Sequence, residues 1–327
     1  MREKVRVRGV HYRLFSEFLF SDNCTGFPLI RPAGTFSLME KGCIRDPRQD
    51  LKVKHHLFNI LFILLFFATP TLSFAELQLE SSPTQSGLLR GHVDSGVQVF
   101  YADRQLKIAP DGSFILGFGR DAMQQQSLTL IDPDGTKHIH KLTLKQRKYD
   151  IQKINGISKR MMNPSEDDLR RIRQEAQQVA KARQQDNDQL NFQESFIWPV
   201  VGRISGIYGS QRILNGEPRR PHFGIDIAAP TGTLVKAPAG GVVTLAHQGM
   251  FFSGATLIVD HGYGLSSSFL HLSKILVKVG EPVVQGQTIA KVGASGRVTG
   301  PHLDWRINWF KQRLDPALLV PPMPKKN

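Results

Sequence analysis

The C-terminal part of the chain consists of short runs of β-branched and other apolar residues. Residues 233–235, 241–245, 255–259 and 275–279 are runs of this kind, and such residues favour extended strands. Gly and Pro residues between the runs mark turns. The pattern therefore predicts a compact, mostly antiparallel β domain over residues 196–327.

Five polar side chains interrupt this apolar pattern on three segments. Residues two or four positions apart in a strand lie on the same face, so His222 shares a face with Asp226, and His302 with Asp304. His271 ends the third segment. Such groups are costly in an apolar sheet unless they satisfy one another or bind a metal. Imidazole and carboxylate groups in this arrangement predict a single zinc site.

The segments around these residues resemble the lysostaphin- and LytM-type zinc endopeptidases of bacterial peptidoglycan. The resemblance covers residues 198–310 and depends on four motifs in the same order, at residues 219–230, 269–273, 279–286 and 292–303. It implies an antiparallel β peptidase domain that uses one Zn²⁺ per chain. It also implies peptidoglycan as the substrate, with hydrolysis of peptide bonds in the stems or cross-links.

The resemblance also implies a role for each polar residue. His222 and Asp226 match two zinc ligands of the family. His271 and His302 match the catalytic histidines that act on the metal-bound water or stabilise the developing oxyanion. The third ligand of the family is the second histidine of a His-x-His pair, and in this chain that position is Asp304.

Asp304 departs from the family pattern together with Arg306, because the family usually reads His-Leu-His-Phe-Glu here. Three interpretations remain open. Asp304 binds zinc directly, as carboxylates do at about the same distance as imidazole; or it pairs with Arg306 and the site is impaired; or His302 or a water completes the zinc shell. A second carboxylate ligand would raise the pKa of the metal-bound water above the ~7 usual for histidine-rich sites.

The N-terminal part of the chain contains an export signal. Residues 57–67 are apolar except for Asn59, follow two lysines, and lead to Ser-Phe-Ala at residues 73–75. This pattern predicts a cleavable signal peptide over residues 51–75. The apolar run is shorter than the roughly 20 residues that span a bilayer, so we expect no stable membrane insertion after cleavage. A periplasmic or secreted protein is expected, and the resemblance favours a Gram-negative periplasm.

Residues 1–50 have no function upstream of a signal peptide, and we interpret them as a non-native N-terminal extension. They hold both cysteines, so residues 76–327 have neither a disulfide framework nor thiolate chemistry available. Residues 76–327 carry 31 Lys and Arg against 22 Asp and Glu, a net charge of +9. An exported protein of this charge is expected to meet anionic cell-wall polymer and not nucleic acid.

Two segments lie between the signal and the peptidase domain. Residues 76–145 contain short apolar runs separated by two Pro-Asp-Gly turns, which predicts a small β-sandwich that could bind a protein partner. Residues 146–195 are predicted to form a helical segment and linker, because Ser165 precedes three acids and apolar residues then recur at helical spacing. The helix either packs along a domain or acts as a regulatory arm over the active site.

The expected fold is therefore mainly β, with a LytM-like peptidase domain preceded by a small β-sandwich and a helical linker. The predicted function is that of an exported zinc-dependent endopeptidase of peptidoglycan. The alternative is a catalytically impaired LytM-like module that binds peptidoglycan or activates another cell-wall hydrolase. Retention of four of the five site positions favours the enzyme.

Overall fold

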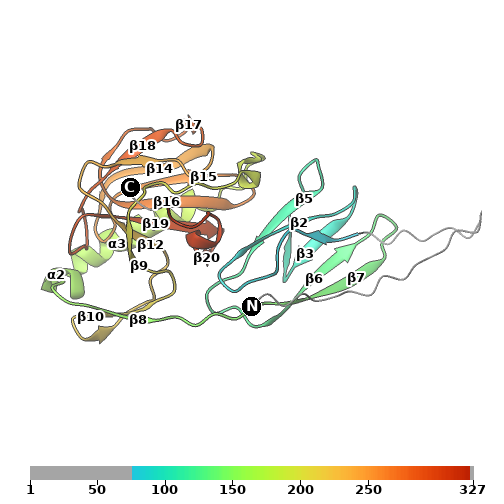
Figure 1. Ribbon diagram of the computed structural model, residues 1–327, viewed down its shortest axis with the longest axis horizontal. Helices are drawn as coiled ribbons and strands as arrows, with labels where there is room; N and C mark the ends of the chain where they lie inside the picture. Colours follow the sequence, from blue (N-terminus) through green and yellow to red (C-terminus); the bar gives the residue numbers. More distant parts are fainter. Residues whose placement is uncertain (1–75, 325–327) are drawn as a thin grey trace, which may run out of the picture. The chain divides into compact units, whose positions relative to one another are not determined.

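The computed structural model describes residues 76–324, and these residues are mainly β (Figure 1). The predicted N-terminal extension and signal peptide lie outside the described residues. The described residues form one compact unit. Across residues 76–324, no helix combines the length and apolar character needed to cross a bilayer.

Residues 76–145 form two antiparallel sheets, as the predicted sandwich requires. Burial alternates along Leu88–His92, whereas residues 114–117 are all buried, and Gly112 and Gly135 of the two Pro-Asp-Gly turns adopt a positive φ that favours glycine. The first sheet has the order β1 (Gln78–Leu79), β2 (Leu88–His92), β5 (Ser113–Gly117). The second has the order β4 (Arg104–Gln105), β3 (Gln98–Tyr101), β6 (Gln125–Ile131), β7 (Lys137–Thr143).

The segment that follows contains the predicted helix, α3 (Glu166–Ala182). The Ser165 side chain accepts a hydrogen bond from the backbone N–H of Asp168, and the first turn carries three acids that favour the helix dipole. The predicted helix start is therefore confirmed. Shorter elements flank α3, namely β8 (Ile151–Ile154), α2 (Lys159–Met162) and the 3₁₀ turn η1 (Asn191–Gln193).

The C-terminal region is dominated by one ten-stranded sheet (Figure 1). Its main path runs β17 (Pro282–Val283), β14 (Gly241–Met250), β15 (Gly254–Asp260), β16 (Leu265–Ile275), β19 (His302–Trp309), β12 (Ile225–Ala228), β9 (Arg203–Gly206). The strands β13 (Leu234–Lys236), β18 (Thr288–Val292) and β20 (Gln312–Leu314) pair off this path. A separate small sheet joins β8 to β10 (Gln211–Leu214) and β11 (Glu217–Pro218).

Residues 275–279, predicted as a strand, leave the sheet after Ile275. Leu276 and Val279 are exposed, and the chain turns at Gly280, whose φ is +86°. The Glu281 carboxylate accepts a hydrogen bond from the Lys278 backbone N–H at 2.9 Å, so this segment satisfies its polar groups as a turn. The strand prediction was wrong here because β-branched composition does not distinguish a strand from an apolar turn.

The centre of the sheet separates an apolar face from a polar face. In β16 and β19, Phe269 lies opposite Trp305, and both are fully buried. The next pair along the same strands, Leu270 and Asp304, points to the other side because side chains alternate in a strand. The apolar face holds the core of the domain, and the opposite face carries the polar residues of the predicted site.

His261 is buried at the end of β15, outside the predicted site. Its side chain is fully inaccessible, with Nδ1 2.6 Å from the Gly240 carbonyl oxygen and Nε2 2.8 Å from Ser267 Oγ. Burial is the main cause that lowers the pKa of His261 to about 4. The folded protein therefore holds His261 in its neutral form near neutral pH.

This burial predicts acid sensitivity. The pKa of an unfolded histidine is about 6.5, so below that pH the unfolded chain binds a proton at this residue. Folded His261 binds the same proton only near pH 4 and below, so acid stabilises the unfolded chain relative to the folded protein. His261→Gln removes this titration. Between pH 7 and pH 4, the difference in free energy of unfolding between wild type and variant, measured by urea denaturation, should shift by about 3 kcal/mol in favour of the variant. Equal pH slopes in the two proteins would contradict the prediction.

Candidate functional site

The pairing of β12 with β19 brings the two predicted carboxylate ligands together. Asp226 lies directly opposite Asp304 in this antiparallel pair, and Ala228 lies opposite His302. Directly opposed residues have Cβ atoms about 5 Å apart. Two like charges at this separation are unfavourable unless cations compensate them. The register of one strand pair therefore defines a site that requires positive charge.

His222 joins the two aspartates from the segment before β12. Its backbone is fixed on both sides, since its N–H donates to the Ser210 carbonyl and its carbonyl accepts from Gly209. Ligand atoms of His222, Asp226 and Asp304 all lie within 4.8 Å of one another, and all three residues are buried. The structure thus brings together the three residues that the sequence predicted as metal ligands.

Two glycines make room for the carboxylates, and this role was not predicted from the sequence. A Cβ at Gly206 would clash with the Asp226 carboxylate, and one at Gly224 would clash with Oδ1 of Asp304. Gly224 was visible in the motif, but only the sheet register shows which side chain lies over it. Any larger residue at either position would displace a predicted ligand.

His271 and His302 lie beside this cluster with their rings 4.9 Å apart between centroids. Nδ1 of His271 is 2.8 Å from the Ser295 carbonyl oxygen, and Nδ1 of His302 is 2.9 Å from that of Gly300. A carbonyl only accepts, so Nδ1 carries the proton in the neutral ring and Nε2 has a free lone pair. His271 Nε2 is 4.0 Å from Asp304, and His302 Nε2 is 3.8 Å from Asp226.

The backbone of His271 is strained. Its φ is +64°, a left-handed conformation that costs a non-glycine residue about 1–2 kcal/mol. The His271 N–H donates to the Ser253 carbonyl at 2.9 Å, and the pairing of β16 with β18 shifts register just after it. Such outliers persist where the surrounding structure determines them, often at functional sites. The sequence predicted the residue but not this conformation.

The same surroundings affect the protonation of His271. Burial is the main cause that lowers its pKa to about 4, against an opposing contribution from the Asp304 carboxylate. His271 is therefore neutral at neutral pH. A neutral imidazole with an unprotonated Nε2 can accept a proton in the site.

Each aspartate also contacts one guanidinium group. Arg212 Nη2 lies 2.6 Å from Oδ2 of Asp226 and leaves Oδ1 facing His222, at 3.0 Å from its Nε2. Arg306 forms a bidentate pair with Asp304, at 2.9 Å to Oδ1 and 2.5 Å to Oδ2. The ion pair with Arg306 that the sequence raised as one interpretation is present. Arg212 was not predicted, because nothing in its own sequence segment signals it.

The charges favour ionised carboxylates. Burial opposes the ionisation of Asp304, but Arg306 and His222 together outweigh burial and hold the pKa of Asp304 far below its usual range. Burial likewise opposes ionisation of Asp226, and His222 and Arg212 lower its pKa. Both residues are therefore ionised at neutral pH, as metal ligands must be.

The polar atoms of the cluster fit a divalent metal. Nδ1 of His222 is buried and makes no hydrogen bond, and Nε2 of His222 and Oδ1 of Asp226, which lie 3.0 Å apart, have no partner other than each other. Leaving buried polar atoms unsatisfied costs about 1–3 kcal/mol each, so such atoms need an explanation. A cation between His222, Asp226 and Asp304 would be bound by one ring nitrogen of His222 and by the two carboxylates. Asp304 can take part although Arg306 binds it, because each carboxylate oxygen has two lone pairs.

The comparisons with known proteins agree with this geometry. Residues 220–316 match the family described as Peptidase family M23. The peptidoglycan DD-endopeptidase ShyA of Vibrio cholerae serotype O1 is 38% identical over 123 residues, which cover 33% of this chain and 28% of that protein. The DD-carboxypeptidase/endopeptidase Mpg of Neisseria meningitidis serogroup B is 36% identical over 126 residues, covering 38% and 29%. The chain thus spans less than a third of these relatives.

A solved structure extends the similarity beyond the matched domain. The crystal structure described as a peptidase M23 from Pseudomonas aeruginosa superposes with a TM-score of 0.54 at 29% identity. The superposition covers 73% of this chain and 94% of that one. The expected mainly β fold with a LytM-type peptidase domain is therefore confirmed.

The first prediction from the site concerns His222. His222→Ala removes the one imidazole of the cluster, so the variant should lose bound zinc, measured by inductively coupled plasma mass spectrometry after dialysis. The far-UV circular dichroism spectrum should stay unchanged, because an apolar β core and not the metal holds the domain together. Zinc retention at the wild-type level would place the metal elsewhere.

A pair of variants separates two of the three interpretations of Asp304. If Asp304 binds the metal, Asp304→Ala should weaken zinc binding more than Arg306→Met does, because Arg306→Met removes only a partner of the ligand and such losses cost about 10–100-fold. If Asp304 only neutralises Arg306, both variants should bind zinc like the wild type. Competition titration with a chelator gives the affinities, and thermal unfolding reports the cost of leaving either charge unpaired.

Proposed function

Residues 220–316 form a domain of peptidase family M23, and from this premise we propose that the chain is a zinc-dependent endopeptidase of peptidoglycan. It would hydrolyse peptide bonds in the stems or cross-links. The observation that carries the proposal is the convergence of three buried ligand groups with two imidazoles whose Nε2 atoms are unprotonated in the neutral rings.

The chemistry follows from the residues in place. A zinc ion bound by His222, Asp226 and Asp304 would supply Lewis-acid polarisation of the scissile carbonyl and a more acidic water. Neutral His271 can accept a proton at Nε2, while its Nδ1–H, held by the Ser295 carbonyl, fixes the ring. His302 is held in the same way by Gly300. The protonated ring can then donate to the leaving amine or to the oxyanion.

The second candidate function is a catalytically impaired LytM-like module that binds peptidoglycan or activates another cell-wall hydrolase. One observation favours it, namely that Arg306 engages both oxygens of Asp304. The enzyme is the better-supported proposal because the ligand atoms of Asp304 still lie within 4.8 Å of those of His222 and Asp226.

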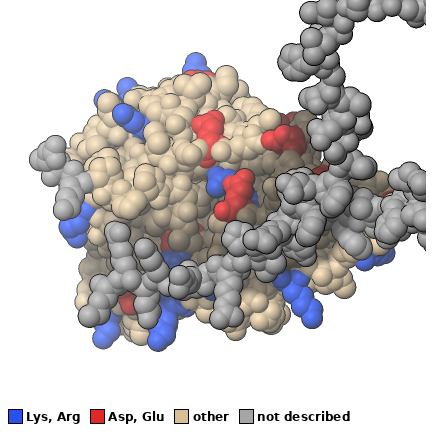
Figure 2. All heavy atoms as spheres, turned by 45° about the vertical axis from the view of Figure 1, so that its right-hand side comes forward, with Lys and Arg blue, Asp and Glu red and all other residues tan. Residues whose placement is uncertain are grey.

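We also propose export to the periplasm or the cell exterior, on the basis of the signal peptide predicted at residues 51–75. The surface is compatible with an anionic polymer as the partner. On the face that Figure 2 shows, Lys and Arg side chains are spread over the described surface, with acidic side chains between them.

The catalytic histidines provide the test. His271→Ala and His302→Ala should each keep bound zinc and lower the rate of cleavage of purified sacculi by about 100-fold or more, the usual size of acid–base and oxyanion contributions. Released muropeptides, separated by liquid chromatography and identified by mass spectrometry, give the rate and the bond cleaved.

His140→Ala is the matched control, because His140 is an exposed histidine of strand β7 outside the site. It should cleave at the wild-type rate. Wild-type protein that binds zinc but releases no muropeptide would favour the impaired module.

A further inference from the structure

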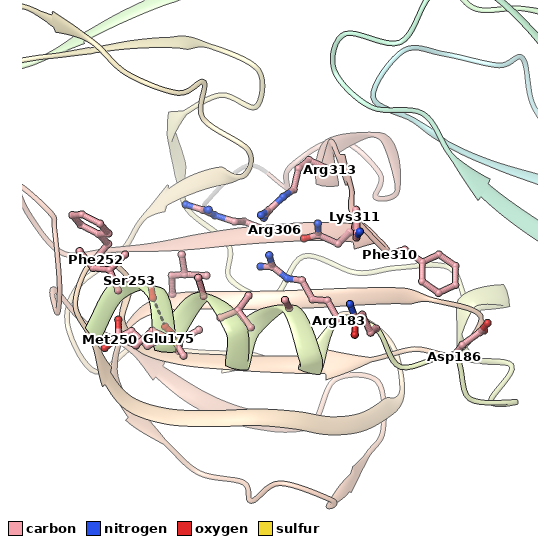
Figure 3. A pocket seen from close by; sticks show the side chains of 18 of the residues that line it. Glu175, Arg183, Asp186, Met250, Phe252, Ser253, Arg306, Phe310, Lys311 and Arg313 are labelled. Atoms are coloured by element: carbon pink, nitrogen blue, oxygen red, sulfur yellow. Dashed lines mark hydrogen bonds between the residues drawn. The ribbon is translucent and has the colours of Figure 1, made fainter. Parts of the chain in front are cut away.

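A cavity of about 830 Å³ lies between α3 and the polar face of the sheet (Figure 3). Arg306 and Asn308 of β19 and Leu270 of β16 line it from the sheet. These residues lie on the same face as Asp304, since side chains alternate along each strand. The cavity therefore lies on the face of the sheet that carries the candidate metal centre, and Arg306 connects the two through its ion pair with Asp304.

One wall of the cavity is apolar. It is formed by side chains of α3 and of the neighbouring strands, namely Ile172, Ala176, Val179, Ala180, Met250 and Leu270. A wall of this kind favours aliphatic groups of a ligand over water.

The opposite part of the cavity is cationic. Arg183, which follows α3, and Arg306 and Arg313 from the β19–β20 hairpin line this part of the cavity (Figure 3). Lys311 also lines this part of the cavity. With Arg104, five cationic side chains thus line the cavity.

The acids that line the cavity are already engaged. Glu175 accepts hydrogen bonds from Arg171 at 2.7 Å and from the Phe251 backbone N–H at 2.8 Å. Asp186 lies 3.8 Å from Lys107. The cationic end therefore has no free carboxylate among the lining residues.

Two of the arginines lack an acidic partner within residues 76–324. Arg183 donates to Ser268 Oγ at 2.8 Å, and its Nε has no hydrogen-bond partner. Nη1 of Arg313 is also buried without a partner. Only Arg306 forms an ion pair, with Asp304. Donors of this kind are costly when unsatisfied and are placed to receive an anion.

The pKa shifts of Arg183 and Arg313 agree with their lack of acidic partners. Burial, together with the neighbouring charge of Arg306, lowers the pKa of Arg313 to about 10. Burial lowers the pKa of Arg183 well below its usual value, and the charges of Arg313 and Arg306 add to the effect. Arginine remains protonated in proteins, so these groups are charged and mutually repulsive. A bound anion would relieve the repulsion.

We propose that Arg183 and Arg313 form a subsite for a free carboxylate of the peptide substrate, whose aliphatic part lies against the α3 wall. The inference rests on the proposed function, because a peptide cleaved at the metal centre would extend along the same sheet face. A guanidinium binds a planar carboxylate in a bidentate manner. Stem peptides of peptidoglycan supply both the carboxylates and short aliphatic side chains.

The test compares two substrates with the full chain. A cross-linked stem peptide with free carboxylates is assayed beside the same peptide with its carboxylates converted to amides. Amidation should lower the wild-type kcat/KM by about 10–100-fold, the range of a charge-assisted hydrogen bond. Arg183→Gln and Arg313→Gln should each raise KM for the acidic peptide about tenfold, with little change in kcat and in zinc content, and should discriminate less between the peptides.

Two further variants keep the test interpretable. Arg173→Gln is the matched control, because Arg173 is an exposed arginine of α3 that does not line the cavity. It should retain the wild-type preference. Arg183→Lys keeps the charge without the bidentate geometry, so it should recover part of the preference that Arg183→Gln loses. Equal loss in Arg173→Gln would overturn the assignment.

The outcomes separate this inference from the proposed function. If the wild type cleaves both peptides equally, the subsite is refuted and the endopeptidase proposal stands. If it cleaves neither, isothermal titration of the uncleaved peptides decides: tighter binding of the acidic peptide that depends on Arg183 supports the subsite, and equal binding refutes it. Inhibition by inorganic phosphate as strong as by the acidic peptide would overturn the carboxylate assignment in favour of a general anion site.

Discussion

The site depends on the placement of two ionised carboxylates opposite one another in neighbouring strands of a buried sheet. Asp226 and Asp304 repel each other in this register, and burial raises the cost of both charges. Arg212, Arg306 and His222 compensate them from three different segments. Apolar residues would be energetically more favourable in this buried part of the sheet, so the polar cluster is present at a cost in stability.

This charge compensation explains why residues 304 and 306 both differ from the pattern of the family that the chain resembles. A histidine followed two residues later by a glutamate carries one negative charge when the histidine is neutral. Asp304 and Arg306 carry none in sum, because the guanidinium neutralises the carboxylate. The pair thus resembles a neutral imidazole in charge while it keeps an oxygen near His222 and Asp226. A lone aspartate would have made the site more negative and harder to bury.

The sequence predicted the fold class, the helix start at Ser165 and the residues that converge, because composition, spacing and motif order determine them. It did not predict the features that depend on the pairing register of the strands. Gly206 and Gly224 make room for carboxylates, and the left-handed backbone of His271 follows a register shift. Arg212 reaches Asp226 from a strand of a separate sheet. Such contacts join residues far apart in the chain, and local patterns carry no information about them.

The sequence left two interpretations of α3 open, a helix that packs along a domain and a regulatory arm over the active site. The position of α3 is consistent with elements of both. It packs along the domain and contacts β14, and it does so on the face that carries Asp304 and Arg306. An apolar stripe on a charged helix needs an apolar partner, and Leu270 and Met250 provide one. Arg183 then enters the polar part of that face. A helix that packs in this way covers part of the sheet face on which the candidate metal centre lies, so packing along the domain and lying over that face are one and the same arrangement.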